Sequence, residues 1–268
     1  MTLLAHRGVT AQARDNSAGA LAAVSHAACS GVPLGIEMDI RATADDLVLN
    51  HDPFEWGVPL FDVPMSDLRA QLLDECPITL SEGLSLLQNV PVIDIEIKED
   101  DTAKQTIDHV IRHCEETGKP ISSFLFVSFI PRAIAEVKQI DPRFKTGMLI
   151  EGNLTTSRPS PDRVCLTLDD EPDQMGIDIA ETMWRVADHV NADFLSPHWT
   201  ILNRLVLDLA TERNKHVLPW SVNHRHLLVA LMERPEVMHV VTDFPGLMFP
   251  DLGQPLTYRK FAPLSDSH

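Results

Sequence analysis

The chain has 268 residues, 44% of them hydrophobic, and its 22 Lys and Arg against 39 Asp and Glu give a formal net charge of −17 at pH 7. This apolar fraction supports a folded core and excludes a disordered chain, and the length is ordinary for an α/β barrel. The acidic balance argues against nucleic-acid binding and against unaided docking on an anionic membrane, because both require a positive surface.

Short β-branched runs alternate along the chain with segments of helical periodicity, a pattern typical of βα units on a parallel sheet. We expect strands at 2–5, 35–40, 92–97, 124–129, 146–150, 192–196, 216–220 and 239–243, with helices at 17–29, 81–88, 101–116, 131–140, 177–190 and 200–214. Two segments interrupt the alternation: an ordered loop at 52–78 with a short helix near 66–73, and a polar segment at 151–174 with a candidate strand at 164–168.

Eight strands with helices between them predict a (β/α)₈ TIM barrel with an eight-stranded parallel sheet. A doubly wound open sheet would instead need a glycine-rich phosphate loop after its first strand, and the residues that follow this one are not glycine-rich. Since no linker divides two cores, we expect a single domain over residues 1–268.

The cysteines Cys29, Cys76, Cys114 and Cys165 lie far apart and form no C-x-x-C pair. This spacing excludes a disulfide framework and a thiolate zinc site, and it predicts small buried side chains in a reducing compartment. No basic and apolar leader opens the chain and no apolar stretch is a good membrane span. We therefore expect a cytoplasmic protein without a stable membrane anchor.

Two predicted strands carry charges where a strand buried on both faces should be apolar. Side chains alternate between the faces of a strand, so Glu37 and Asp39 share one face, and Asp94, Glu96 and Lys98 share one face of the next strand. If the apolar residues between them face the helices, these charges point into the barrel. The alternative is a pair of half-exposed strands whose acids meet water or a neighbouring lysine.

Carboxylates that converge inside a barrel repel one another unless a cation lies between them. Glu37, Asp39 and Glu96 offer only hard oxygen ligands, which suit Mg²⁺ or Ca²⁺ better than Zn²⁺. The sequence therefore predicts a divalent-metal site, and the choice among Mg²⁺, Ca²⁺ and Mn²⁺ stays open.

Two histidines lie near the same strand ends. His6 and Arg7 close the first predicted strand, and His51 follows the second beside Asp52, which could fix the histidine tautomer or cap a turn. Histidine takes and gives a proton near neutral pH, so a pair flanking a cation suits cleavage of a phosphate ester. Arg7 and Lys98 would supply positive charge to the phosphate oxygens. Taken alone, a single such histidine is more often structural than catalytic.

The order His6-Arg7-Gly8, Glu37-Met38-Asp39, His51-Asp52 resembles the H-R…E-x-D…H-D signature of the glycerophosphodiester phosphodiesterases. The resemblance extends through most of the chain, to the following segments: Asp94-Ile95-Glu96-Ile97-Lys98, Val127-Ser128-Phe129, Pro219-Trp220-Ser221-Val222-Asn223 and Val241-Thr242-Asp243-Phe244-Pro245.

This resemblance implies a (β/α)₈ barrel that uses a divalent metal to hydrolyse glycerophosphodiesters, as small-molecule substrates, to glycerol 3-phosphate and an alcohol. It implies His6 and His51 as the acid/base pair and Arg7 and Lys98 on the phosphate. It implies Trp220 near the ligand, although a tryptophan at a barrel mouth could equally serve packing. The metal ligands that it implies are Glu37, Asp39 and Glu96, in agreement with the strand parity.

The chain departs from the family pattern in two places, which bear on the preference for the glycerol or the alcohol portion. Arg14-Asp15-Asn16-Ser17 stands where the family usually has P-E-N-T, and Pro53-Phe54-Glu55-Trp56-Gly57 stands where an R-x-T element is common. The connection after His51-Asp52 is also too short for the inserted subdomain of some members.

Two rival functions stay open. The first is a lysophospholipase D-like phosphodiesterase, which would call for an apolar rim at the barrel mouth, with Phe54, Trp56, Leu60 and Phe61 as candidates. The second is a non-catalytic phosphoester- or metal-binding barrel. The nucleophile could be water or the glycerol 2-hydroxyl, and Asp243 at the last strand end could orient a neighbour or cap a turn.

Overall fold

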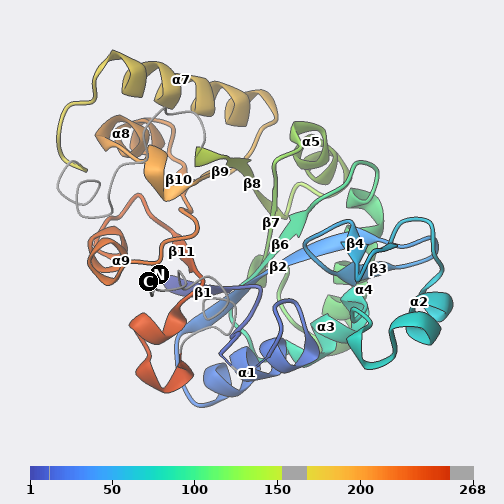
Figure 1. Cartoon of the computed structure of the whole chain (residues 1–268). Helices are drawn as coiled ribbons and strands as arrows, with labels where there is room; N and C mark the ends of the chain where they lie inside the picture. Colours follow the sequence, from blue (N-terminus) through green and yellow to red (C-terminus); the bar gives the residue numbers. More distant parts are fainter. Residues whose placement is uncertain (12, 153–167, 254–268) are drawn as a thin grey trace, which may run out of the picture.

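The computed structural model describes residues 1–11, 13–152 and 168–253. Eight parallel strands form a nearly closed barrel with helices around it (Figure 1), in the order β10-β9-β8-β7-β6-β2-β1-β11. The strands are β1 (Thr2–His6), β2 (Leu34–Ala42), β6 (Ile93–Ile97), β7 (Phe124–Ser128), β8 (Lys145–Ile150), β9 (Phe194–Pro197), β10 (His216–Val217) and β11 (His239–Thr242).

Hydrogen bonds join the two ends of this sheet. The Met238 N–H donates to the Val217 carbonyl at 3.0 Å, and the Val241 N–H donates to the Pro219 carbonyl at 3.0 Å. The eight parallel strands confirm the predicted barrel, although β10 is shorter than the sequence pattern indicates.

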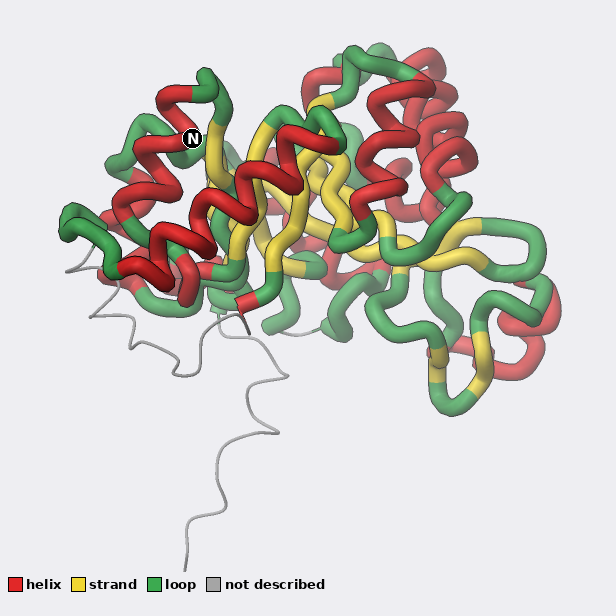
Figure 2. The backbone as a smooth tube through the Cα atoms, turned by 90° about the horizontal axis from the view of Figure 1, so that it is seen from above, coloured by secondary structure: helices red, strands yellow, loops and turns green. Residues whose placement is uncertain are grey.

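Helices cover the outside of the barrel (Figure 2). Six of them lie within a few residues of the predicted helices. The additional helix, α9, was not predicted, because its apolar run is too short and too uniform to show a helical periodicity. The helices around the barrel are α1 (Ala18–Cys29), α3 (Leu80–Leu86), α4 (Ala103–Thr117), α5 (Pro131–Ile140), α7 (Gln174–His189), α8 (Arg204–Glu212) and α9 (Arg225–Met232).

The barrel interior is filled below the strand ends. Phe194 on β9 is 1% exposed and packs with the inward-facing residues Leu4, Leu125 and Leu218. A Cβ atom at Gly147 on β8 would lie 2.0 Å from the Phe194 ring, so only glycine fits opposite it. Because this layer closes the barrel, polar side chains can gather only above it, at the C-terminal ends of the strands.

The connection after β2 is more elaborate than predicted. Strand β3 (Leu47–Leu49) pairs antiparallel with the end of β2, and a separate hairpin follows, formed by β4 (Phe54–Glu55) and β5 (Val58–Pro59). The predicted short helix appears as α2 (Met65–Leu72). Leu60 is only 1% exposed, in a cluster with Val48, Met65 and Leu68, so its assignment to an apolar rim is wrong.

Two further predictions concern single segments. The cysteines are not all buried as expected, because Cys29 ends α1 and is exposed, while Cys76 and Cys114 are half-buried. Cys165 and all but the last residue of the candidate strand at 164–168 lie outside the described residues. Among the helices that the structure describes, none has both the length and the apolar character needed to cross a bilayer.

Candidate active site

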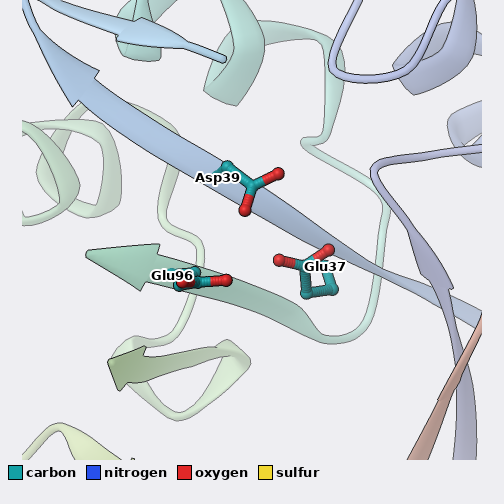
Figure 3. Close-up of side chains that lie close together, drawn as sticks. All are labelled: Glu37, Asp39 and Glu96. Carbon is teal, nitrogen blue, oxygen red and sulfur yellow. The ribbon is translucent and has the colours of Figure 1, made fainter. Parts of the chain in front are cut away.

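Three carboxylates from adjacent strands converge inside the barrel (Figure 3). The β2–β6 register places Asp39 beside Glu96, with Glu37 two positions earlier on the same face of β2, opposite Asp94. They are at most 7% exposed, and one oxygen from each lies within 4.8 Å of the other two. The alternation of apolar and acidic residues predicted this convergence, and the alternative of half-exposed acids is wrong.

The acids differ in their electrostatic surroundings. Burial and the neighbouring carboxylate of Asp39 raise the pKa of Glu37 to about 8 and that of Glu96 to about 7. Burial alone would also raise the pKa of Asp39, but Arg7 and Lys98 hold it well below its usual range. Lys98 Nζ lies 2.6 Å from a Glu96 oxygen and 3.0 Å from Asp39 Oδ1, and Arg7 Nε lies 3.0 Å from Asp39 Oδ2.

Asn16 fixes the rotamer of Asp39 through two hydrogen bonds. Its Nδ2 donates to Asp39 Oδ2 at 2.8 Å, and its Oδ1 accepts from the Asp39 backbone N–H at 3.2 Å. Asn16 has φ +54°, a left-handed conformation that asparagine tolerates better than most residues. Asn16 was not predicted as a site residue, although it is the asparagine that survives in the altered P-E-N-T element.

His6 lies between two carboxylates. Its Nδ1 donates to Asp243, and its Nε2 lies 3.7 Å from a Glu37 oxygen. Asn223 Nδ2 donates to the second Asp243 oxygen at 2.5 Å. Burial alone would lower the pKa of His6, and the carboxylates of Glu37 and Asp243 raise it above its ordinary value. Asp243 thus orients a neighbour, the first of its two predicted alternatives.

The backbone at the end of β1 brings Arg7 over the acids. Arg7 has φ +57° and Gly8 has φ +93°, so the chain turns sharply, and the Arg7 N–H lies 3.1 Å from Glu37 Oε2. A Cβ atom at Gly8 would lie 2.9 Å from the backbone of Ala20, which explains the glycine after the His-Arg pair.

His51 follows β3 and is held by its neighbours. Its Nδ1 lies 2.7 Å from Asp52 Oδ1, and Arg41 donates to its backbone carbonyl from Nε at 3.0 Å and from Nη2 at 2.8 Å. Burial and the positive charges of Arg7 and Lys98 lower the pKa of His51. Asp52 therefore fixes the His51 ring, the first of the two roles that the sequence left open.

Residues 6–247 match the sequence model of the glycerophosphoryl diester phosphodiesterase family. The chain belongs to this family. The match covers most of the chain and confirms both the resemblance seen in the motifs and the predicted enzyme class, a phosphoric diester hydrolase. No curated protein sequence matches the chain.

Solved structures share the barrel at low sequence identity. A glycerophosphodiester phosphodiesterase from Parabacteroides distasonis is 19% identical with a TM-score of 0.66, over 94% of this chain and 96% of that one. A phosphodiesterase from Oleispira antarctica, solved with the product sn-glycerol-3-phosphate, is 18% identical with a TM-score of 0.67, over 94% and 96%. One from Agrobacterium tumefaciens is 18% identical with a TM-score of 0.64, over 92% and 98%.

In this phosphodiesterase-family chain the candidate residues other than Asp39, which is completely buried, line one pocket of about 140 Å³. Glu37, Glu96, both histidines and Lys98 form its polar side, and Val127, Phe129 and Trp220 form an apolar side. Trp220 Nε1 donates to the Ser196 carbonyl at 2.9 Å, and its ring packs edge-on against Phe129 with centroids 5.5 Å apart. Trp220 therefore both packs and faces the pocket. Phe129 was missed as a wall residue, although it belongs to a motif segment.

Asp94 is a fourth buried acid of this region, and it also lines the pocket. It is 1% exposed, and its Oδ1 makes no hydrogen bond to any residue that the structure describes. Burial, with Glu37 and Glu96 nearby, raises the pKa of Asp94 well above its usual range.

The acidic cluster fits a divalent cation. Oxygen ligands bound to Mg²⁺ or Ca²⁺ at about 2.0–2.6 Å are at most about 4–5 Å apart, which matches the spacing of the oxygens of Glu37, Asp39 and Glu96. Burial and the mutual repulsion of the acids raise the pKa of both glutamates, and a cation bound between the carboxylates would oppose both effects. These acids could therefore hold one hard cation.

Proposed function

We propose that this chain hydrolyses glycerophosphodiesters to glycerol 3-phosphate and an alcohol, with His6 and His51 as the general acid/base pair. The observation that carries the proposal is the placement of two histidines, each paired with its own carboxylate, around one buried acidic cluster in a single pocket. The family match and the product complex of the Oleispira antarctica relative support the same substrate class.

Each residue has a role that its contacts support. One histidine would remove the proton of the attacking hydroxyl and the other would protonate the leaving alkoxide. Arg7 and Lys98 carry several N–H donors each, and only part of them contact the acids, so the others can bind phosphate oxygens. Trp220 would form the apolar wall beside the substrate.

Glu37, Asp39 and Glu96 would hold a divalent cation, Mg²⁺, Ca²⁺ or Mn²⁺. When bound, such an ion supplies Lewis-acid stabilisation of the charge that develops on the phosphoryl group. A small-molecule substrate, a single barrel domain and a cytoplasmic location complete the proposal.

The test is release of glycerol 3-phosphate from a panel of glycerophosphodiesters, with each metal in turn. The His51→Ala variant should stay folded and lose nearly all turnover, because Asp52 and Arg41 position His51 without contributing to the core. His26→Ala, a change of an exposed histidine on α1, is the matched control and should keep wild-type activity.

Full activity of His51→Ala would refute the catalytic assignment. Binding of glycerol 3-phosphate by the wild-type chain without hydrolysis of any diester would instead favour the non-catalytic barrel.

A further inference from the structure

The β4–β5 hairpin presents aromatic side chains to solvent. Phe54 is 52% exposed, Trp56 is 71% exposed and Phe61, just after the hairpin, is 51% exposed. Soluble proteins rarely gather several exposed aromatic residues within eight positions without a contact surface to serve. Figure 2 shows the hairpin, two short strands beside α2, standing out from the body of the barrel.

The tip of this hairpin is an unusual place for tryptophan. Trp56 has φ +49° and Gly57 has φ +82°, so both residues of the two-residue turn are left-handed. Such a turn favours Asn-Gly, and a bulky residue at its first position is disfavoured. A tryptophan that is exposed and disfavoured by the local conformation is explained by a contact that the tip makes outside the chain.

The hairpin stands at the entrance to the active site. Glu55 forms an ion pair with Arg14, in the segment that departs from the family motif. Glu55 and Arg14 also line a polar pocket together with Arg7 and His51, and these last two residues line the acidic pocket as well. A protein or lipid surface that the hairpin contacts would therefore lie beside the entrance to the pocket.

Size and charge decide the kind of surface. Three exposed aromatic side chains, each able to bury at most roughly 150–250 Å², fall short of the roughly 800 Å² per partner of a stable protein interface. The aromatic rings of Trp and Phe suit the interfacial region of a lipid layer. The net charge of −17, with exposed Asp52 and Asp62 beside the aromatics, disfavours anionic lipid.

We infer that the β4–β5 hairpin and the residues just after it dock reversibly on a zwitterionic lipid–water interface through Phe54, Trp56 and Phe61. The observation behind this inference is the tryptophan at the hairpin turn beside the pocket entrance, whose side chain is exposed and whose backbone is left-handed. Docking does not depend on hydrolysis, so it can be measured whether or not the proposed function holds.

The experiment is cosedimentation of the full chain with phosphatidylcholine vesicles, with phosphatidylglycerol vesicles and without lipid. The decisive variant is Trp56→Asn, because asparagine is preferred at this turn position and should keep or strengthen the hairpin while removing the ring. We expect binding of the wild-type chain to phosphatidylcholine, weakened about tenfold or more in Trp56→Asn. Ile140→Ser, at the end of α5, is the matched control and should bind as the wild type does.

Three results would overturn the inference: absence of wild-type binding to phosphatidylcholine, equal binding by Trp56→Asn, or binding to the anionic vesicles alone. A concentration-dependent dimer that Trp56→Asn abolishes would also overturn it, since the occupant would then be a second copy of the chain.

A second measurement rests on the proposed function. Trp56→Asn should hydrolyse soluble glycerophosphocholine at the wild-type rate and lose activity only towards lysophosphatidylcholine in micelles. Failure of the wild-type chain to hydrolyse glycerophosphocholine would count against the proposed function and leave the vesicle result intact. Equal loss on both compounds would contradict a docking role for the hairpin.

Discussion

The substitution Asp243→Asn tests the hydrogen bond that orients His6. Asp243 accepts from His6 Nδ1 with one oxygen and from Asn223 Nδ2 with the other. An asparagine at 243 must point its amide nitrogen at one of these two donors, so one hydrogen bond is lost in either orientation. A hydrogen bond to a charged group contributes about 1.5–3 kcal/mol, which predicts a decrease in kcat of about 10- to 160-fold.

The pH profile separates this positioning role from a merely structural one. Asp243 helps to raise the pKa of His6 against the effect of burial, so its neutralisation lowers that pKa. The limb of the kcat profile that His6 controls should therefore move to lower pH, whether His6 acts as acid or as base.

The assay is the initial rate of glycerol 3-phosphate release at saturating substrate and metal across the neutral pH range. The control is Asp251→Asn, which removes an exposed carboxylate further along the chain than Asp243 and should change neither kcat nor its pH profile. A folded Asp243→Asn variant with wild-type kcat and an unshifted profile would refute the reasoning.

Three more substitutions probe separate parts of the structure. Glu37→Gln should raise the metal concentration needed for half-maximal activity about 10- to 100-fold, and an unchanged titration would contradict the ligand role. Asp94→Asn should raise the urea midpoint of the metal-free protein at pH 8 and change it little near pH 4. The reason is that the raised pKa of Asp94 penalises folding only where the carboxyl of the unfolded chain is ionised. Equal urea midpoints for the wild type and Asp94→Asn at pH 8 would contradict this. Burial lowers the pKa of His239 to about 4, with its Nδ1 accepting from the Thr2 N–H at 3.2 Å. The unfolded imidazole therefore takes up a proton below about pH 6.5, and the wild-type free energy of unfolding should fall by about 2 kcal/mol more than that of His239→Gln between pH 7 and pH 5. Parallel curves for the two proteins would rule this out.

Local sequence patterns determined the barrel and the acidic cluster. Strand period and turn residues predict the eight strands, because side-chain alternation and helix periodicity depend on neighbours along the chain. The same alternation placed Glu37, Asp39 and Glu96 inside the barrel. The alternation could not show that Leu60 is buried or that the backbone of Trp56 is left-handed, since both depend on how the segment after β2 folds on itself.

The long-range contacts that orient His6 and Asp39 were decided by the tertiary structure. Asp243 and His6 are 237 positions apart and meet because β11 pairs with β1. Asn16 reaches Asp39 only because the turn after β1 folds back over β2. The sequence alone therefore determined which charged groups face inward, a property of each strand. Which of them hold one another in place was set by the packing of distant strands, whose relative positions no local pattern encodes.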